Sequence, residues 1–266
     1  MRNASSPAPE RRHDVPPESV PGAAHFGFVA VPESEKVNLV RRHFNTVAPK
    51  YDFMNTLLSF GVHYAWKRIA VGMMDLKKGD RVIDVCGGTA DLALMAARHI
   101  GSSGRVFLYD INWAMMMTGR PKVESSPYHN RIVYTQGDAE NISFADNSLD
   151  GAMVGFGIRN LTHMERGFRE MHRVLRPGGK LMCLEFSEPV TPWFRFLYDF
   201  YSFRIMPALG RLLAGSRLAY TYLPESIRLF PGPGELKSKL ESIGFIDVRY
   251  RLLTNGIAAV HVGVKA

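Results

Sequence analysis

Between residues 80 and 190 the chain alternates short apolar runs with stretches whose apolar residues lie three or four positions apart. A continuous run such as Val82-Ile-Asp-Val85 is typical of a strand covered on both faces, whereas the wider spacing is typical of amphipathic helices. We expect strands near residues 81–85, 105–110, 131–135, 150–155 and 179–185, and helices near 90–100, 112–122 and 163–174. This alternation predicts an α/β fold with a Rossmann-like, doubly wound parallel sheet.

The segments on either side of this alternation also have clear patterns. Three helices are expected before the first strand, from Ser34 to Pro49 and near residues 53–59 and 62–72, so that residues 34–78 form a helical cap. After Gly244 the pattern indicates two further strands, which the short connection Thr254-Asn-Gly256 allows to pair as an antiparallel hairpin at the sheet edge. A parallel sheet closed by one antiparallel hairpin is the layout of class I methyltransferases, and we assign residues 34–266 to one such domain.

Residues 189–230 interrupt the alternation. Aromatic side chains are dense from Trp193 to Phe203, and arginines follow at intervals. This pattern predicts two or three amphipathic helices that form a lid over a hydrophobic substrate, a membrane-surface insert, or both. Packing of the aromatic residues into the core is the alternative.

Residues 1–33 are rich in proline and carry mixed charges, and no apolar run follows the early arginines. We expect a disordered tail rather than a secretory signal.

Composition narrows the classes of function. The chain has 266 residues, of which 46% are hydrophobic, and a net charge of +8. No run of eighteen apolar residues predicts a membrane-spanning helix. The basic residues are spread along the chain, which disfavours nucleic acid and leaves an anionic membrane surface or simple solubility open. Cys86 and Cys183 are isolated, so neither a disulfide framework nor a metal site is expected.

The candidate chemistry begins at a glycine turn after the first strand. Gly87 and Gly88 allow the backbone to turn sharply and approach a ligand, and Asp110 ends the next strand, where it can accept hydrogen bonds from a ribose. The loop lacks the G-x-G-x-x-G pattern of dinucleotide sites, and Asp91 in the first helical turn would repel a pyrophosphate. These residues favour S-adenosylmethionine, whose sulfonium is cationic, over NAD.

Several motifs together resemble one family, the ubiquinone/menaquinone biosynthesis C-methyltransferases of the UbiE type. They are Tyr51-Asp-Phe-Met-Asn55, Ser59-Phe-Gly-Val-His63, Phe156-Gly-Ile-Arg-Asn160 and Leu184-Glu-Phe-Ser187, and the resemblance covers residues 36–266. It implies a class I methyltransferase fold and methyl transfer from S-adenosylmethionine to a ring carbon of a polyprenylated quinol. The acceptor would be demethylmenaquinol, the methoxylated benzoquinol of the ubiquinone branch, or both.

The resemblance also implies cofactor contacts. Thr89 would touch the methionine end, Asp110 the ribose, and Asp138 and Ala139 the adenine. Two positions depart from the family pattern. Ala90 replaces a glycine of the turn, which is tolerable unless that position needs a positive φ, and Gly155 replaces a serine that contributes a contact.

Methylation at a quinol carbon requires that a phenolate be formed and stabilised. Arg159 is the predicted oxyanion partner, with a salt bridge to a nearby carboxylate as its alternative role. Asn160 could orient a quinol oxygen. His63 is the candidate base, because histidine titrates near physiological pH, although a hydrogen-bonded helix residue is the alternative.

The residues leave other functions open. These are methylation of another hydrophobic small molecule, a non-catalytic S-adenosylmethionine-binding subunit of a quinone-synthesis complex, and a dehydrogenase. We expect a cytoplasmic protein, peripheral at the inner face of the membrane, with a polyprenyl quinol substrate, no nucleic-acid partner, and a homodimer as one assembly open to it.

Overall fold

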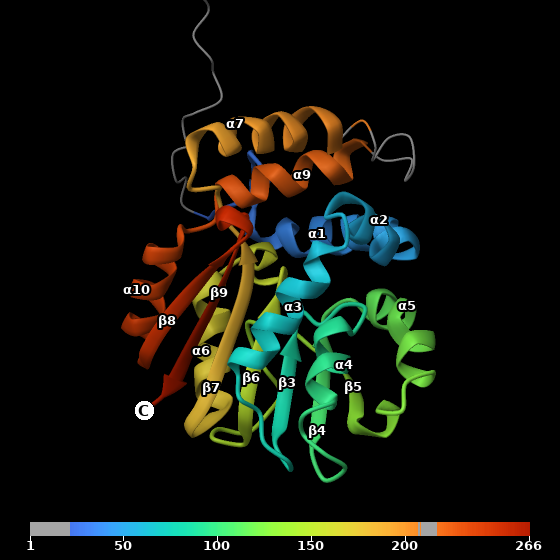
Figure 1. Ribbon diagram of the computed structural model, residues 1–266, viewed down its shortest axis with the longest axis vertical. Coiled ribbons are helices and arrows are strands. Elements are labelled where there is room, and N and C mark those ends of the chain that lie inside the picture. The colour runs from blue at the N-terminus through green and yellow to red at the C-terminus, as the bar shows by residue number, and fades with distance from the viewer. Residues whose placement is uncertain (1–21, 207, 209–216) are drawn as a thin grey trace, which may run out of the picture.

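A seven-stranded sheet forms the centre of the molecule (Figure 1). The computed structural model describes residues 22–206, 208 and 217–266. The strand order is β5-β4-β3-β6-β7-β9-β8, and all neighbouring strands run parallel except at β9, which is antiparallel to both β7 and β8. The strands are β3 (Arg81–Val85), β4 (Arg105–Asp110), β5 (Ile132–Gln136), β6 (Leu149–Gly155), β7 (Leu175–Phe186), β8 (Phe245–Leu253) and β9 (Ala258–Lys265). The predicted doubly wound sheet with a C-terminal antiparallel hairpin is confirmed.

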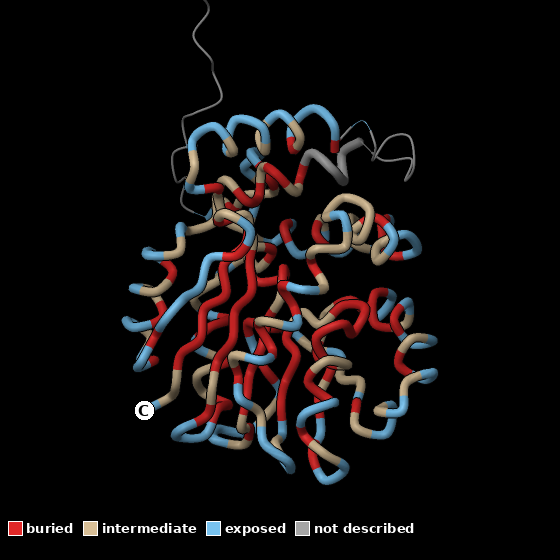
Figure 2. Tube along the Cα trace, in the orientation of Figure 1, coloured by how far each residue is buried: buried red, intermediate tan, exposed pale blue. Residues whose placement is uncertain are grey.

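Helices cover both faces of this sheet. Alternate strand residues point to opposite faces, so Val82 packs in one apolar cluster and Ile83 in the other. The first cluster is closed by α3 (Val62–Met73), α4 (Asp91–Ala97) and α5 (Trp113–Glu124), and the second by α6 (Met164–Val174) and α10 (Pro233–Ile243). Figure 2 shows the strands buried between these layers. The burial explains why the strands are continuous apolar runs.

The remaining helices lie beyond the carboxyl ends of the parallel strands (Figure 1). The cap consists of α1 (Glu33–Val47), the 3₁₀ turn η1 (Ala48–Lys50) and α2 (Tyr51–Leu58). The predicted insert contains α7 (Pro192–Phe200), the π-helical turn η4 (Tyr201–Ile205) and α9 (Arg217–Arg228), which we call the lid. In the described part of the chain, no helix is long and apolar enough to cross a membrane.

Order begins earlier than the sequence predicts. The expectation of a disordered tail through residue 33 is wrong for its last part, because β1 (Ala23–Phe26) and β2 (Val29–Pro32) form an antiparallel hairpin. The hairpin contacts α9, since Phe26 stacks on Tyr222 with ring centroids 4.3 Å apart and the Phe28 N–H donates to Glu225 Oε2 at 3.1 Å. Residues 1–21 of the predicted tail lie outside the described residues.

Candidate active site

Two neighbouring cavities lie where the cap and lid meet the sheet. The sheet-edge cavity, of about 90 Å³, lies at the carboxyl ends of β3, β4, β5 and β6 beneath α1. The lid cavity, of about 400 Å³, lies between the cap helices, α3 and the lid. Phe44, Tyr51 and Phe156 line both cavities. Ligands bound in the two cavities would therefore lie next to each other, with these three side chains at their common boundary.

The glycine turn after β3 has the backbone that the sequence predicts. Cys86 and Gly88 have φ values of +55° and +51°, and Gly88 lines the sheet-edge cavity. A Cβ on Gly87 would lie 2.3 Å from Leu108 Cδ1 and 2.9 Å from the Asp84 carbonyl oxygen, so this position admits only glycine. Gly88 is thus a cavity residue, whereas Gly87 serves the turn itself.

Asp110 occupies the position that the sequence assigns to it. Its Oδ2 accepts a hydrogen bond from the Gly88 N–H at 2.9 Å, and its Oδ1 accepts one from the Asn112 N–H at 2.7 Å. Burial raises the pKa of Asp110 to about 6, although these two hydrogen bonds oppose the rise. Each carboxylate oxygen keeps a further lone pair for a ligand hydroxyl. Asp138 and Ala139 line the same cavity, and their contact with adenine stays a prediction.

Thr89 and Asp91 have other partners than the sequence suggests. Thr89 does not line the sheet-edge cavity. Its hydroxyl instead donates to Asp52 Oδ1 of α2 at 2.6 Å. Asp91 forms ion pairs with Lys67 at 2.7 Å and Lys122 at 2.5 Å. Burial alone would raise the pKa of Asp91, but the two lysines outweigh it and the pKa falls to about 2. The expected repulsion between Asp91 and a pyrophosphate is therefore wrong, because its charge is compensated.

Ala90 has a φ of +71°, which is the left-handed conformation that favours glycine. The departure from the family's glycine therefore places an alanine at a position that needs a positive φ. At the other departure, a Cβ on Gly155 would lie 2.5 Å from Leu92 Cδ1. A serine there would require Leu92 to move.

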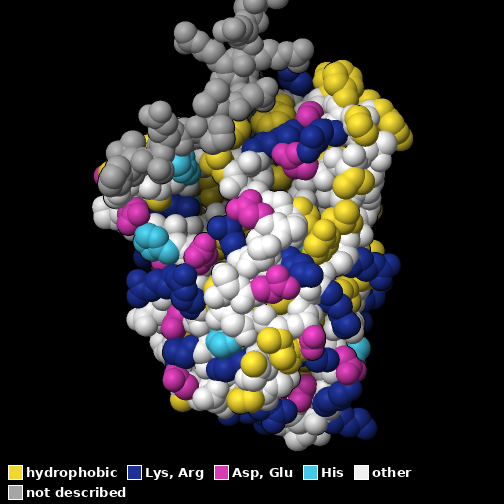
Figure 3. Space-filling model, turned by 90° about the vertical axis from the view of Figure 1, so that its left-hand side faces the viewer, with side chains coloured by type: hydrophobic (Ala, Val, Ile, Leu, Met, Phe, Trp, Pro, Cys, Tyr) yellow, Lys and Arg dark blue, Asp and Glu magenta, His cyan; other side chains and the backbone are white. Residues whose placement is uncertain are grey.

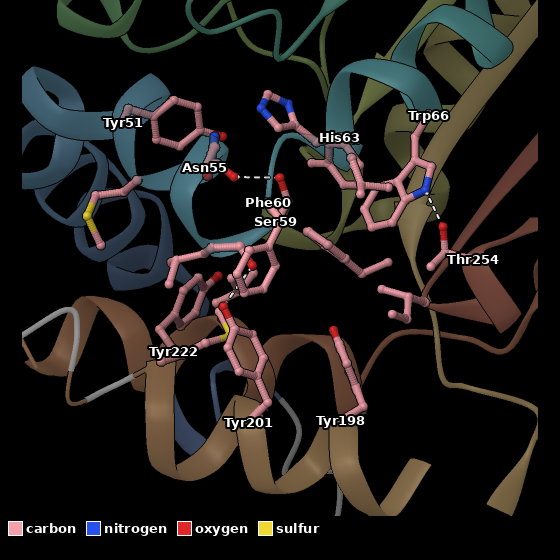
Figure 4. A pocket seen from close by; sticks show the side chains of 18 of the residues that line it. Tyr51, Asn55, Ser59, Phe60, His63, Trp66, Tyr198, Tyr201, Tyr222 and Thr254 are labelled. Carbon is pink, nitrogen blue, oxygen red and sulfur yellow. Dashed lines mark hydrogen bonds between the residues drawn. The ribbon is translucent and has the colours of Figure 1, made fainter. Parts of the chain in front are cut away.

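The lid cavity is rich in aromatic side chains. Figure 4 shows Tyr51 of α2 and His63 and Trp66 of α3 on one side of the cavity, facing Tyr198, Tyr201 and Tyr222 of the lid. Two hydrogen bonds fix its walls, from Trp66 Nε1 to Thr254 Oγ1 at 2.8 Å and from the Tyr201 hydroxyl to the Leu58 carbonyl at 2.8 Å. Such a lining suits a flat, apolar ligand with a few polar atoms.

Arg159 lines the lid cavity but is not a free cation. Its Nη1 donates to both carboxylate oxygens of Glu185, at 3.1 and 3.0 Å, and its Nε donates to Ser226 Oγ at 3.3 Å. The two side chains of the ion pair are only 7% and 2% exposed. Burial raises the pKa of Glu185, and Arg159 counteracts part of the rise. The salt bridge that was the alternative role of Arg159 is thus present, and Nη2 takes part in none of these bonds.

Asn160 does not line the lid cavity. Its side chain lies at the sheet-edge cavity, donates to the Gly157 carbonyl at 3.2 Å and accepts the Tyr222 hydroxyl at 2.8 Å. Asn160 therefore fixes Tyr222, which does line the lid cavity, instead of facing a substrate oxygen there. The expected contact with a quinol oxygen stays a prediction.

His63 lines the lid cavity in a neutral state. Burial, with a smaller contribution from Lys67, lowers its pKa to about 4. Its Nε2 lies 3.3 Å from Thr56 Oγ1, and the Thr56 hydroxyl proton is directed to the Asp52 carbonyl at 2.8 Å. On this basis we assign the ring proton to Nε2, which leaves a lone pair on Nδ1. That Nδ1 is buried and has no partner among the described residues.

Comparison with known proteins shows the family of the chain. A model of the ubiE/COQ5 methyltransferase family matches residues 31–265. The chain belongs to this family. The ubiquinone/menaquinone biosynthesis C-methyltransferase UbiE of Methylococcus capsulatus is 45% identical over 91% of this chain and 97% of its own length. The protein of the same name from Stutzerimonas stutzeri is 42% identical over 97% and 98%.

Solved structures share the fold of this family member at low sequence identity. A SAM-dependent methyltransferase from Thermotoga maritima is 17% identical, with a TM-score of 0.59 over 85% of this chain and 99% of that one. A methyltransferase from Haloferax volcanii, solved with its activator Trm112, has a TM-score of 0.60 at 15% identity over 83% and 96%. The fold is therefore that of class I methyltransferases.

As a member of the ubiE/COQ5 family, the protein is an S-adenosylmethionine-dependent methyltransferase. The residues that line the sheet-edge cavity are of the kinds that could hold this cofactor. Asp110 and Asp138 offer carboxylate acceptors, the glycine turn brings its backbone to the cavity, and Val40, Met115 and Leu161 supply apolar walls for a purine. Among the residues that the structure describes, no group of His, Cys, Asp and Glu could hold a metal ion.

Several residues of the site were not predicted individually. Glu185, Lys67, Lys122 and Tyr222 hold or line the two cavities. Glu185 had a sequence signal, because it is a carboxylate within the apolar run Leu181-Met-Cys-Leu-Glu-Phe186. A charge in a buried strand requires a partner.

Proposed function

We propose that this methyltransferase acts on a ring carbon of a polyprenylated quinol, either demethylmenaquinol or the methoxylated benzoquinol of the ubiquinone branch. The observation that carries the proposal is the shared wall of Phe44, Tyr51 and Phe156 between the sheet-edge cavity and an aromatic cavity. A quinol ring is flat and apolar, and its hydroxyls match the few polar groups of the lid cavity. The relatives named for ubiquinone and menaquinone biosynthesis support this substrate class.

In this proposal the cofactor, held by Asp110, Asp138 and the glycine turn, supplies an electrophilic methyl group. The aromatic walls of the lid cavity hold the quinol ring and exclude water, which strengthens electrostatic interactions inside. Arg159 lines the lid cavity, and its remaining Nη2 donors can stabilise a developing phenolate. Because Glu185 already neutralises much of its charge, this stabilisation is weaker than that of an unpaired arginine.

His63 is the proposed proton acceptor. A neutral imidazole with an unpaired Nδ1 can accept a proton, and because Nδ1 is buried in this structure, the ring has to turn to bring it to the quinol hydroxyl. Its low pKa makes it a weak base, so proton transfer is expected to accompany, rather than precede, attack by the ring carbon. His63→Gln should lower kcat about 100-fold and leave cofactor affinity intact. This variant keeps a donor for Thr56 and removes the titratable lone pair.

The substrate assignment is tested by extracting quinones from cells that lack this protein. Accumulation of demethylmenaquinone or demethylubiquinone, reversed by the wild-type gene but not by a His63→Gln copy, is the expected result. A normal quinone profile in the deletion strain would reject the substrate class. Accumulation that His63→Gln reverses fully would reject the role of His63 alone.

A further inference from the structure

The lid carries a row of exposed aromatic side chains on its outer face. Trp193, Phe196, Phe200 and Phe203 recur every three or four residues along α7 and η4, and their exposed fractions are 66%, 73%, 57% and 40%. This spacing places them on one side of the helix. None of the four lines the lid cavity. We call them the lid stripe, and in Figure 3 hydrophobic side chains gather at this end of the molecule.

The opposite side of the same helix lines the lid cavity, through Phe194, Leu197 and Tyr198. The helix is thus apolar on both sides, whereas a surface helix of a globular protein has one polar face toward solvent. Tyr201, which follows in η4, lies with its ring centroid 6.2 Å from that of Phe60, a cavity residue that is 81% exposed. The stripe therefore adjoins the mouth of the cavity.

The charges beside the stripe leave a net positive charge. Arg195 and Arg204 are exposed on the same helical segment, and Arg195 pairs with Glu188. The acidic residue of the segment, Asp199, pairs with Arg228, so the three arginines outnumber the two carboxylates by one. Exposed aromatic residues with flanking arginines match an anionic lipid surface, where aromatic rings insert at the headgroup level and arginines contact the phosphates.

The size of the cavity gives this surface a purpose if the proposed function holds. A cavity of about 400 Å³ is within the range that encloses a compound of drug size. It can hold a quinol ring and the start of a tail, but a long polyprenyl chain must extend through the mouth. Beside the lid stripe, that chain would remain in an apolar environment if the stripe is inserted in a bilayer.

We propose that the lid stripe docks the enzyme on the surface of an anionic bilayer, so that the quinol ring enters the lid cavity directly from the lipid. The bilayer is the occupant of this face, and the inner side of α7 guides the ring from the lipid to the cavity.

Binding to vesicles tests the docking surface without any substrate. The wild-type protein should cosediment with vesicles of phosphatidylglycerol and phosphatidylcholine, and about tenfold less with phosphatidylcholine alone. The double variant Phe196→Ser/Phe200→Ser should bind the mixed vesicles at least about tenfold more weakly. The matched control Ile246→Ser/Leu252→Ser, which changes exposed residues of β8, should bind like the wild type.

Fluorescence locates the contact. Quenching by lipids with brominated chains should be lost in Trp193→Phe and retained in Trp113→Phe, whose tryptophan is 45% exposed on α5. The lid double variant should keep its turnover on a short-chain, water-soluble quinol, because neither residue lines the cavity.

Two results would overturn the proposal. One is a wild-type protein that does not bind anionic vesicles at physiological salt. The other is a wild-type dimer that the lid double variant converts to a monomer in sedimentation equilibrium, which would make the stripe a subunit interface. Vesicle binding without turnover on any quinol would instead reject the proposed function and leave the docking surface standing.

Discussion

The buried ion pair between Arg159 and Glu185 allows the structural and catalytic roles of Arg159 to be separated. Replacing Arg159 with methionine leaves the Glu185 carboxylate in a site where only 2% of its side chain is exposed. Removing one partner of a buried pair costs about 3–5 kcal/mol of folding stability. The double variant Arg159→Met/Glu185→Leu removes both charges and keeps apolar volume, so it should recover most of this loss.

The pH dependence of the stability of Arg159→Met provides an independent test of the ion pair. Burial raises the pKa of Glu185 even with Arg159 present, and loss of the guanidinium raises it further. A carboxyl group whose folded pKa lies above its unfolded pKa destabilises the fold increasingly as the pH rises through that range. The stability deficit of Arg159→Met should therefore be larger at pH 8 than at pH 5.

Urea denaturation of the wild type, both single variants and the double variant completes the thermodynamic cycle. Additive losses from the two single substitutions would refute the assignment of a coupled buried pair. Turnover is then measured on the stable double variant. If its kcat stays low while cofactor affinity is unchanged, Arg159 acts on the substrate as well as on the fold.

Three further predictions concern other parts of the site. Asp110→Ala should weaken cofactor binding on the order of 100-fold in calorimetry, because the two charge-assisted hydrogen bonds expected with the ribose are lost. Since the pKa of Asp110 is about 6, the affinity of the wild type for the cofactor should also fall as the pH drops below 6. An affinity that does not change with pH would contradict this. The pKa of His63 is about 4 in the folded protein against an ordinary value of 6.5, so the wild type should lose about 2.5 kcal/mol more stability than His63→Gln when the pH is lowered from 7 to 4.5. Urea denaturation of both proteins at both pH values measures this difference. Parallel pH profiles of stability would argue against the burial of His63 as a neutral group. Gly137→Ala should destabilise the protein by about 1–3 kcal/mol, because the added Cβ would lie 2.0 Å from the Tyr109 hydroxyl oxygen. The control Gly234→Ala adds a Cβ in open space and should not lower the melting temperature. Equal melting temperatures of the two variants would contradict the crowding at Gly137.

The sheet could be predicted closely because its signal is local. The continuous apolar runs at 81–85 and 105–110 coincide with β3 and β4, and Asp110 ends its strand as expected. The burial of parallel strands on both faces produces this pattern within each segment, without reference to the rest of the chain.

What the sequence missed depends on contacts between distant segments. The β1–β2 hairpin lies in a proline-rich stretch and is held by α9, so its local composition resembles a disordered tail. The compensation of Asp91 by Lys67 and Lys122 requires α3, α4 and α5 to be brought together. The partner of Arg159 could have been predicted from the sequence. Glu185 is a lone carboxylate in an apolar run, and it lies at the end of β7, the strand adjacent to β6.

The contact between the N-terminal hairpin and α9 also bears on how the protein is made. Phe28 and Glu225 are 197 positions apart in the chain. Ribosomes add about 5–20 residues per second, so the hairpin emerges about 10–40 s before its docking helix is synthesised. The hairpin therefore finds its place only after α9 has been made, and until then the aromatic rings of the hairpin remain without their partners on that helix.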